Sequence, residues 1–189
     1  LNKGLRVTVI DERENFDAIS PDTKKKVTYP QQIESFYFEG GVSSYVLHLN
    51  RKKEQLHVPP VYINKTVDDI SVEVALQYTD VFSENIFSFA NNIHTVDGGM
   101  HVTGFRTALT RALNDYARKN SILKGSDDNL SGEDIREGLT AIISIKLLNP
   151  QFEGQTKAKL GNPEARSIVD TVTAEGLLIY LEEHPVEAR

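Results

Sequence analysis

The stretch Leu139–Leu148, LTAIISIKLL, constrains the possible folds of this chain more than any other part of the sequence. It is rich in β-branched residues and almost wholly apolar, and Asn149-Pro150 ends it. A strand with one wet face alternates apolar and polar residues, whereas a strand covered on both faces is continuously apolar. We therefore predict a central, well-covered strand, which requires other elements to lie over the sheet.

Further strands are predicted from short aromatic or alternating segments over Leu5–Ile10, Ser35–Phe38, Ser71–Tyr78 and Glu84–Asn92. The segment TDVFS between the last two predicts a hairpin, which would make them antiparallel neighbours. The polar segment Asp17–Lys26, which contains a proline, is predicted to be a loop.

Four helices are predicted, over 42–50, after the glycine turn at 97–99, from a capping box that starts at Ser131, and over 163–184. In the last of these, Asn162 is the expected cap, followed by a proline at the first helical position. The longest helix has one apolar stripe, formed by Val102, Phe105, Leu109, Ala112, Leu113 and Tyr116. This order of elements predicts one α+β domain with helices laid over a mixed sheet.

The composition excludes several classes of protein. A formal net charge of −6 argues against a free-standing nucleic-acid binder, which usually has a basic excess, but it permits a locally basic face. Cysteine is absent, which excludes disulfides and thiolate metal sites and suits a reducing cytoplasm. No apolar stretch approaches the roughly 18 to 20 residues that span a bilayer. Because the chain begins with Leu1 and its only methionine is Met100, we expect a segment of a longer protein.

The sequence contains no self-contained active site. Its five histidines are scattered without a metal-binding spacing, so no metal site is predicted. It contains neither the phosphate-binding glycine motifs nor the nucleophile motif of the hydrolases. Two basic features remain as candidates, Arg106 on the longest predicted helix and Lys157 in the loop that follows the central strand.

Because each helical residue is rotated by about 100° from the one before it, Arg106 is expected at the edge of the apolar stripe. One interpretation is an aliphatic stem that covers the edge of the core while its charge stays in water. The other is a guanidinium that faces an anion such as a nucleic-acid phosphate. The residues alone leave both interpretations open.

Lys157 lies in the loop FEGQTKAKLGN beside Gln155. An ammonium group on a flexible stem acts as a point charge toward a phosphate, and the glutamine amide can donate to the same oxygens. Phosphate binding needs more donors than these two, and the sequence contains no other phosphate-binding motif. From the residues alone, a solvated loop is the stronger interpretation and a phosphate contact is the alternative.

Several short sequence motifs, in a consistent order along the chain, resemble those of the ATPase subunits of bacterial type IIA topoisomerases, in particular the DNA gyrase B family. The most specific motif is QTKxKL at 155–160. The similarity runs from Leu1 nearly to Arg189 and is weakest over Asp17–Lys26. The other matching motifs are FEGG at 38–41, VEVALQY at 72–78, NNI at 91–93, GG at 98–99 with His101, GFR at 104–106, TR at 110–111, LN at 113–114 and EDIREGL at 133–139.

The resemblance implies an α+β fold like the second domain of ribosomal protein S5, with a mixed sheet covered by helices and a left-handed βαβ crossover. It implies that residues 1–189 are a single transducer domain, in which 1–30 are a linking strand and loop after an ATPase domain that this chain lacks. The equivalent domain of topoisomerase IV and an independent S5-like module that binds RNA or protein are the alternatives.

The resemblance also implies a function. Gln155 and Lys157 would reach the terminal phosphate of ATP held in the preceding domain, with Lys157 as a catalytic residue, and Arg106 would face DNA. ATP and Mg²⁺ would be cofactors of the full-length protein, and this segment alone would not bind them. ATP binding and hydrolysis would drive entrance-gate closure, DNA strand passage and negative supercoiling. The implied partners are DNA, the gyrase A protein and a second copy of gyrase B, in the cytoplasm and without a membrane.

Overall fold

The computed structural model describes residues 1–12, 16–29 and 32–188. The chain divides into two compact units, one formed by Asn2–Gly41 and the other by Leu1 together with Val42–Arg189. The two units are described separately below.

The smaller unit consists of two antiparallel strand pairs. Strand β1 (Arg6–Ile10) pairs with β4 (Ile33–Tyr37), and β2 (Phe16–Ile19) pairs with β3 (Lys26–Tyr29). Every residue of β1 and β4 is exposed within the chain. The strands predicted over Leu5–Ile10 and Ser35–Phe38 are therefore confirmed as β1 and β4, but neither has a buried face here.

The prediction of a loop over Asp17–Lys26 was wrong at both ends of the segment. Asp17 lies on β2 and Lys26 on β3, and the Lys26 Nζ lies 2.7 Å from the Asp17 Oδ2. The Thr28 hydroxyl donates to the Asp17 Oδ1 at 2.6 Å. The Lys26 hydrogen bond and then that of Thr28 lower the pKa of Asp17. Polar composition misled the prediction because an exposed two-stranded ribbon can be held by backbone and polar cross-strand pairs without an apolar alternation.

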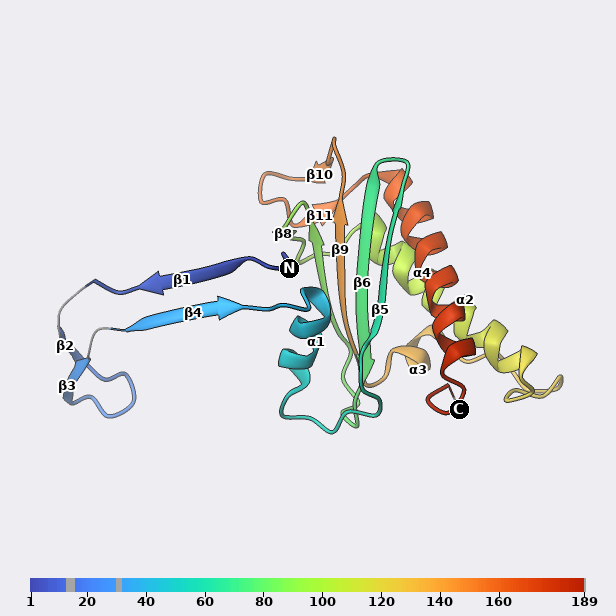
Figure 1. Cartoon of the computed structure of the whole chain (residues 1–189), viewed down its shortest axis with the longest axis horizontal. Coiled ribbons are helices and arrows are strands. Elements are labelled where there is room, and N and C mark those ends of the chain that lie inside the picture. The colour runs from blue at the N-terminus through green and yellow to red at the C-terminus, as the bar shows by residue number, and fades with distance from the viewer. Residues whose placement is uncertain (13–15, 30–31, 189) are drawn as a thin grey trace. The chain divides into compact units, whose positions relative to one another are not determined.

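The larger unit is built on a five-stranded mixed sheet with the order β5-β6-β9-β7-β8 (Figure 1). The strands are β5 (Val61–Val67), β6 (Ile70–Tyr78), β7 (Asn85–Ala90), β8 (Ile93–His94) and β9 (Leu139–Lys146). Strand β9 lies in the centre, and every one of its residues except Lys146 is buried. The prediction from its continuous apolar run is confirmed.

The predicted hairpin between β6 and β7 was wrong, because β9 lies between them. β9 pairs antiparallel with β6, opposing Ile143 to Val74, and parallel with β7, opposing Ile142 to Phe87. A short connection indicated neighbouring strands, but the most apolar strand takes the central position, where both of its faces are protected from water. Strands β7 and β9 are the parallel pair of a βαβ unit, and the chain between them contains β8 and two helices.

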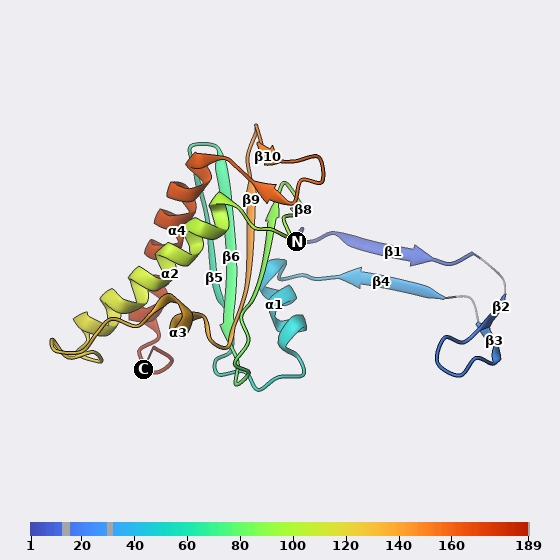
Figure 2. The same ribbon diagram turned by 180° about the vertical axis from the view of Figure 1, so that it is seen from behind.

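Helices cover both faces of this sheet (Figures 1 and 2). Helix α1 (Val42–Asn50) lies on one face, where it packs with Ala75, Phe89 and Ile142. Helices α2 (Met100–Lys119) and α4 (Pro163–Glu183) lie on the other, over the larger apolar core. The predicted mixed sheet covered by helices is confirmed.

Two helix starts were predicted from local signals. Helix α3 (Gly132–Arg136) begins with the expected capping box, in which the Ser131 Oγ accepts from the Asp134 N–H and the Asp134 carboxylate accepts from the Ser131 N–H. Helix α4 begins at Pro163 as predicted, but the Asn162 side chain makes no capping hydrogen bond. Its buried amide binds the loop segment 149–151 instead, as described in the next section.

Candidate functional site

The QTK segment forms the tip of a short β-hairpin. Strands β10 (Phe152–Glu153) and β11 (Lys159–Leu160) pair antiparallel, and the loop 154–158 joins them. An ion pair of 3.0 Å between the Lys159 Nζ and the Glu153 Oε2 spans the two strands. Leu160 is fully buried in the core, so the hairpin is anchored at its base while its tip faces solvent.

The hairpin is attached to the turn that starts α2. The Asp97 N–H donates to the Ala158 carbonyl at 2.9 Å, and the Leu160 N–H donates to the Gly98 carbonyl at 3.1 Å. Gly99 has φ 134° and forms a parallel bridge with Leu160. A Cβ at Gly99 would lie 2.3 Å from the Leu160 carbonyl oxygen, so only glycine permits this close approach. The hairpin and the start of α2 are therefore joined by the backbone itself.

Asn162 fixes the other side of the hairpin. Its Oδ1 accepts from the Gln151 N–H at 2.6 Å, and its Nδ2 donates to the Asn149 carbonyl at 3.1 Å. Nδ2 also donates to the Glu164 carboxylate at 2.7 Å, and this hydrogen bond lowers the pKa of Glu164. Because the asparagine is buried, these bonds hold the chain leaving β9 against the start of α4.

Gln155 and Lys157 are both exposed at the tip of the hairpin. Lys157 has φ 55°, a left-handed conformation that costs a non-glycine residue about 1 to 2 kcal/mol. Its Nζ lies 5.9 Å from the centroid of the Phe152 ring, and its N–H donates to the Gly154 carbonyl at 3.3 Å. The structure therefore places the two predicted phosphate contacts on one fixed, solvent-facing tip.

Arg106 lies on α2, with a side chain that is 47% exposed. Its Nη2 and Nε donate to the same carboxylate oxygen of Glu84, at 2.7 and 3.1 Å. Arg136 donates from its Nε to the other oxygen of Glu84 at 3.2 Å. Arg106 is thus neither a simple cover for the core nor an unpaired charge.

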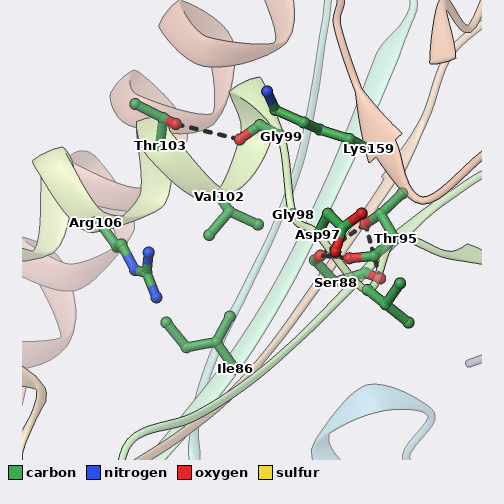
Figure 3. Close-up of a pocket in the computed structure, with 11 residues that line it drawn as sticks. Ile86, Ser88, Thr95, Asp97, Gly98, Gly99, Val102, Thr103, Arg106 and Lys159 are labelled. Atoms are coloured by element: carbon green, nitrogen blue, oxygen red, sulfur yellow. Dashed lines mark hydrogen bonds between the residues drawn. The ribbon is translucent and has the colours of Figure 1, made fainter. Parts of the chain in front are cut away.

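A hollow of about 310 Å³ lies between the start of α2 and the edge of the sheet (Figure 3). Arg106 from α2 and Lys159 from the hairpin both line it, together with Asp97 and Gly99 from the connecting turn. Figure 3 shows the Arg106 side chain extending away from the helix on the side of Ile86. The structure therefore brings Arg106 and the base of the hairpin to one hollow, while Gln155 and Lys157 stay outside it.

A buried polar network lies behind this hollow. The His101 Nε2 lies 3.2 Å from the Thr95 hydroxyl, which lies 2.6 Å from that of Ser88. His101 is fully buried, and its Nδ1 has no hydrogen-bond partner within the described part of the chain. Burial lowers the pKa of His101 to about 4. The ring is therefore neutral at neutral pH and joins the start of α2 to β7.

We expect His101 to make stability depend on pH. The unfolded chain binds a proton near the ordinary value of 6.5 and the folded chain near 4, so stability falls as the pH drops through this interval. From 1.36 kcal/mol per pKa unit, the loss of unfolding free energy between pH 7 and pH 4.5 is about 2 to 3 kcal/mol. Urea denaturation at both pH values should show this loss shrinking by that amount in His101→Gln, and not in the exposed-site control His48→Gln. Equal losses in both variants would contradict the assignment.

The sequence and the fold match proteins of known family. A family model described as DNA gyrase B matches residues 41–189. The chain is 53% identical over 98% of its length to the DNA gyrase B subunit of Clostridium acetobutylicum, and 52% identical over its full length to that of Bacillus mycoides. The chain belongs to the DNA gyrase B family. It spans 27% and 43% of these two relatives, so it corresponds to less than half of each.

Solved structures agree with this assignment. The 43K ATPase domain of Thermus thermophilus gyrase B, in complex with an aminocoumarin, superimposes with a TM-score of 0.77 at 42% identity. The topoisomerase IV ATP-binding domain of Francisella tularensis, in complex with a small-molecule inhibitor, has a TM-score of 0.70 at 30% identity. Each match covers 84% of this chain and 42% of the other.

Two features are absent from the described residues of this gyrase B family member. No cluster of three or more histidine, aspartate or glutamate side chains is arranged there to hold a metal ion. None of the helices found there is both long enough and apolar enough to span a membrane.

Sequence reasoning missed the residues that connect the predicted ones. Glu84 begins a predicted strand and Arg136 lies in a motif that resembles the family, but neither was given a role. They lie 22 and 52 residues from the positions that they contact, Arg106 and Glu84 respectively. The glycines at 98–99 were recognised as a turn, yet no local signal indicated that Leu160 would pack against that turn.

Proposed function

We propose that this chain is the transducer domain of a gyrase B protein, which couples ATP binding and hydrolysis to DNA strand passage. The observation that carries the proposal is the backbone connection between the QTK hairpin and the turn that starts α2. This connection joins a tip with phosphate-binding donors to the helix that holds Arg106. In this proposal, the same backbone path links the nucleotide contact to the DNA contact.

In this proposal, Gln155 and Lys157 donate to the terminal phosphate of ATP bound in a preceding domain. The lysine ammonium stabilises negative charge on the transferred group, as a point charge held by the hairpin. Because ADP lacks that phosphate, the hairpin interacts differently with ATP and ADP, and a conformational equilibrium shifts only through such a difference. The strained backbone of Lys157 fits this role, since strain of this kind gathers at functional sites.

The residues present fit a nucleotide contact and not a complete nucleotide site. The hairpin tip offers donors for phosphate oxygens, and no carboxylate cluster for a metal ion exists among the described residues. Mg²⁺ and the rest of ATP would therefore be held outside this chain, where they would supply the phosphoryl-transfer chemistry. On this basis, the 189-residue chain alone should not hydrolyse ATP.

The smaller unit supports a preceding domain. Its paired strands β1 and β4 carry large apolar side chains that are exposed within the chain: Val7 47%, Val9 56%, Ile10 53%, Ile33 66% and Phe36 46%. A solvated ribbon of this kind is rare without a partner surface. We propose that the ATPase domain before this chain covers them.

Arg106 is proposed to face the DNA that passes between two copies of gyrase B. We expect Arg106→Ala in the full-length protein, assembled with gyrase A, to reduce DNA-stimulated ATP turnover and negative supercoiling while basal turnover changes little. The reason is that a phosphate contact independent of sequence is lost. Steady-state ATPase assays with and without DNA, across a salt series, measure the effect.

The control for this prediction is Arg51→Ala. Arg51 is an exposed arginine directly after α1, so the variant removes the same charge from the other side of the sheet. Unaltered DNA coupling and salt dependence in Arg106→Ala would refute its DNA-facing role. Negative supercoiling of relaxed plasmid by the unaltered assembly distinguishes a gyrase from the equivalent topoisomerase IV protein.

A further inference from the structure

Three elements meet at Glu84, which directly precedes β7. Its carboxylate accepts from Arg106 of α2 on one oxygen and from Arg136 of α3 on the other. The two arginines also line a second, open hollow of about 560 Å³ along α2. Glu84 is therefore a carboxylate bridged by two guanidinium groups beside an open surface.

A carboxylate in this position occupies the donors that would bind a phosphate. Guanidinium groups recognise both anions through the same N–H donors. As long as Arg106 donates two hydrogen bonds to Glu84, those donors are not available to DNA. A phosphate contact through the Nε and Nη2 edge of Arg106, the edge that gives paired hydrogen bonds to an anion here, must therefore compete with this ion pair.

The two arginines differ in how easily they can leave the carboxylate. The Arg106 side chain is 47% exposed, whereas that of Arg136 is 18% exposed and that of Glu84 is 30% exposed. An exposed ion pair is weak, whereas a charge left unpaired inside the protein is costly. If Arg106 turns away, Arg136 still pairs with Glu84, so the carboxylate is not left alone.

We propose that Glu84 is an exchangeable counter-ion for Arg106. Arg106 leaves Glu84 for a phosphate of duplex DNA, and Arg136 keeps the carboxylate in place for the return. The exchange makes each DNA contact short-lived, which suits a segment that must be released after passage. The inference rests on the proposed DNA-facing role of Arg106 and assigns Glu84 and Arg136 as the positioning residues that regulate it.

The test measures the affinity of the full-length protein for a short linear duplex DNA of arbitrary sequence, by fluorescence anisotropy across a potassium chloride series. Glu84→Gln keeps the size of the side chain and removes its charge. We expect affinity to rise roughly threefold at low salt, the range that an exposed ion pair can account for. The salt dependence should also steepen, by at most about 0.9 in the logarithmic slope.

The matched control is Glu175→Gln, which removes the same charge from the exposed ion pair between Glu175 and Lys65. A gain in Glu84→Gln that exceeds this control supports the exchange, and equal affinities overturn it. In an Arg106→Ala background, Glu84→Gln should give no gain, because the released arginine is missing. A gain that persists there would also overturn the inference.

Glu84→Asp covers the possibility that the glutamine variant unfolds. It retains the charge but draws the carboxylate back by one methylene and so weakens its hydrogen bonds to Arg106, and affinity should rise in the same direction by a smaller factor. If Arg106→Ala itself leaves DNA affinity unchanged, the proposed DNA-facing role fails. If Arg106→Ala weakens binding but neither Glu84 variant strengthens it, the exchange alone is wrong.

Discussion

Replacing Lys157 by alanine should reduce the ATP turnover of the full-length protein by roughly 100-fold or more, the usual effect of removing one charged donor from a developing anion. Lys157 is exposed, and within the hairpin its ammonium contacts only the Phe152 ring at a long distance of 5.9 Å. Its loss therefore removes little that holds the hairpin together, and in the proposed role it removes the contact to the phosphate. Steady-state ATPase assays measure the effect, and thermal unfolding shows that the fold is intact.

The control is Lys124→Ala, which removes an exposed lysine from the loop after α2. Its turnover should match that of the unaltered protein. Alanine also keeps a Cβ at position 157, so the left-handed backbone is strained as before and the loop keeps its conformation. Near-normal turnover in Lys157→Ala would show that the hairpin tip does not contact the nucleotide.

Replacing Gly99 by alanine should destabilise the chain by about 3 kcal/mol or more, because backbone and not a flexible side chain opposes the new Cβ. The Cβ would lie 2.3 Å from the Leu160 carbonyl oxygen and 2.5 Å from its nitrogen. The hairpin or the start of α2 must then move, which breaks the hydrogen bonds of Asp97 and Gly98 to the hairpin. Urea denaturation at neutral pH measures the loss.

Gly125→Ala is the matched control, because a Cβ there meets nothing within 4 Å. Its stability should change by no more than about 0.5 kcal/mol. Gly99→Ala tests the function as well, since a displaced hairpin should lower ATP turnover in the full-length protein even where it stays folded. Unchanged stability and turnover would mean that the connection between hairpin and helix is not needed.

Local patterns predicted the elements of the larger unit well. The position of β9, the capping box at Ser131 and the start of α4 at Pro163 each depend on residues within one short stretch. Polar composition failed at Asp17–Lys26, because solvated strands lack the apolar alternation that identifies a half-buried strand. The side chain of Asn162 also departed from its predicted role, because its partners lie in a loop that packs against the helix start.

The candidate site was predicted only in part. Gln155, Lys157 and Arg106 were named as candidates from the residues, and the resemblance then gave all three their expected roles, because the chain contains no complete phosphate site. That Glu84 accepts from Arg106 and Arg136 was not predictable, because an ion pair between remote residues leaves no periodic signal. The close approach of Gly99 to Leu160 was hidden for the same reason.

The sequence by itself determined where the helices of the larger unit and its strands β6, β7 and β9 lie, and that β9 must be buried, because these depend on the spacing of apolar residues along the chain. Only the tertiary structure decided that β9 separates β6 from β7, since several strand orders satisfy the same apolar pattern. It also decided that the QTK hairpin joins the start of α2 and that Arg106 is held by Glu84. Contacts of this kind bring distant segments together, and their geometry is set by how the helices and the sheet pack.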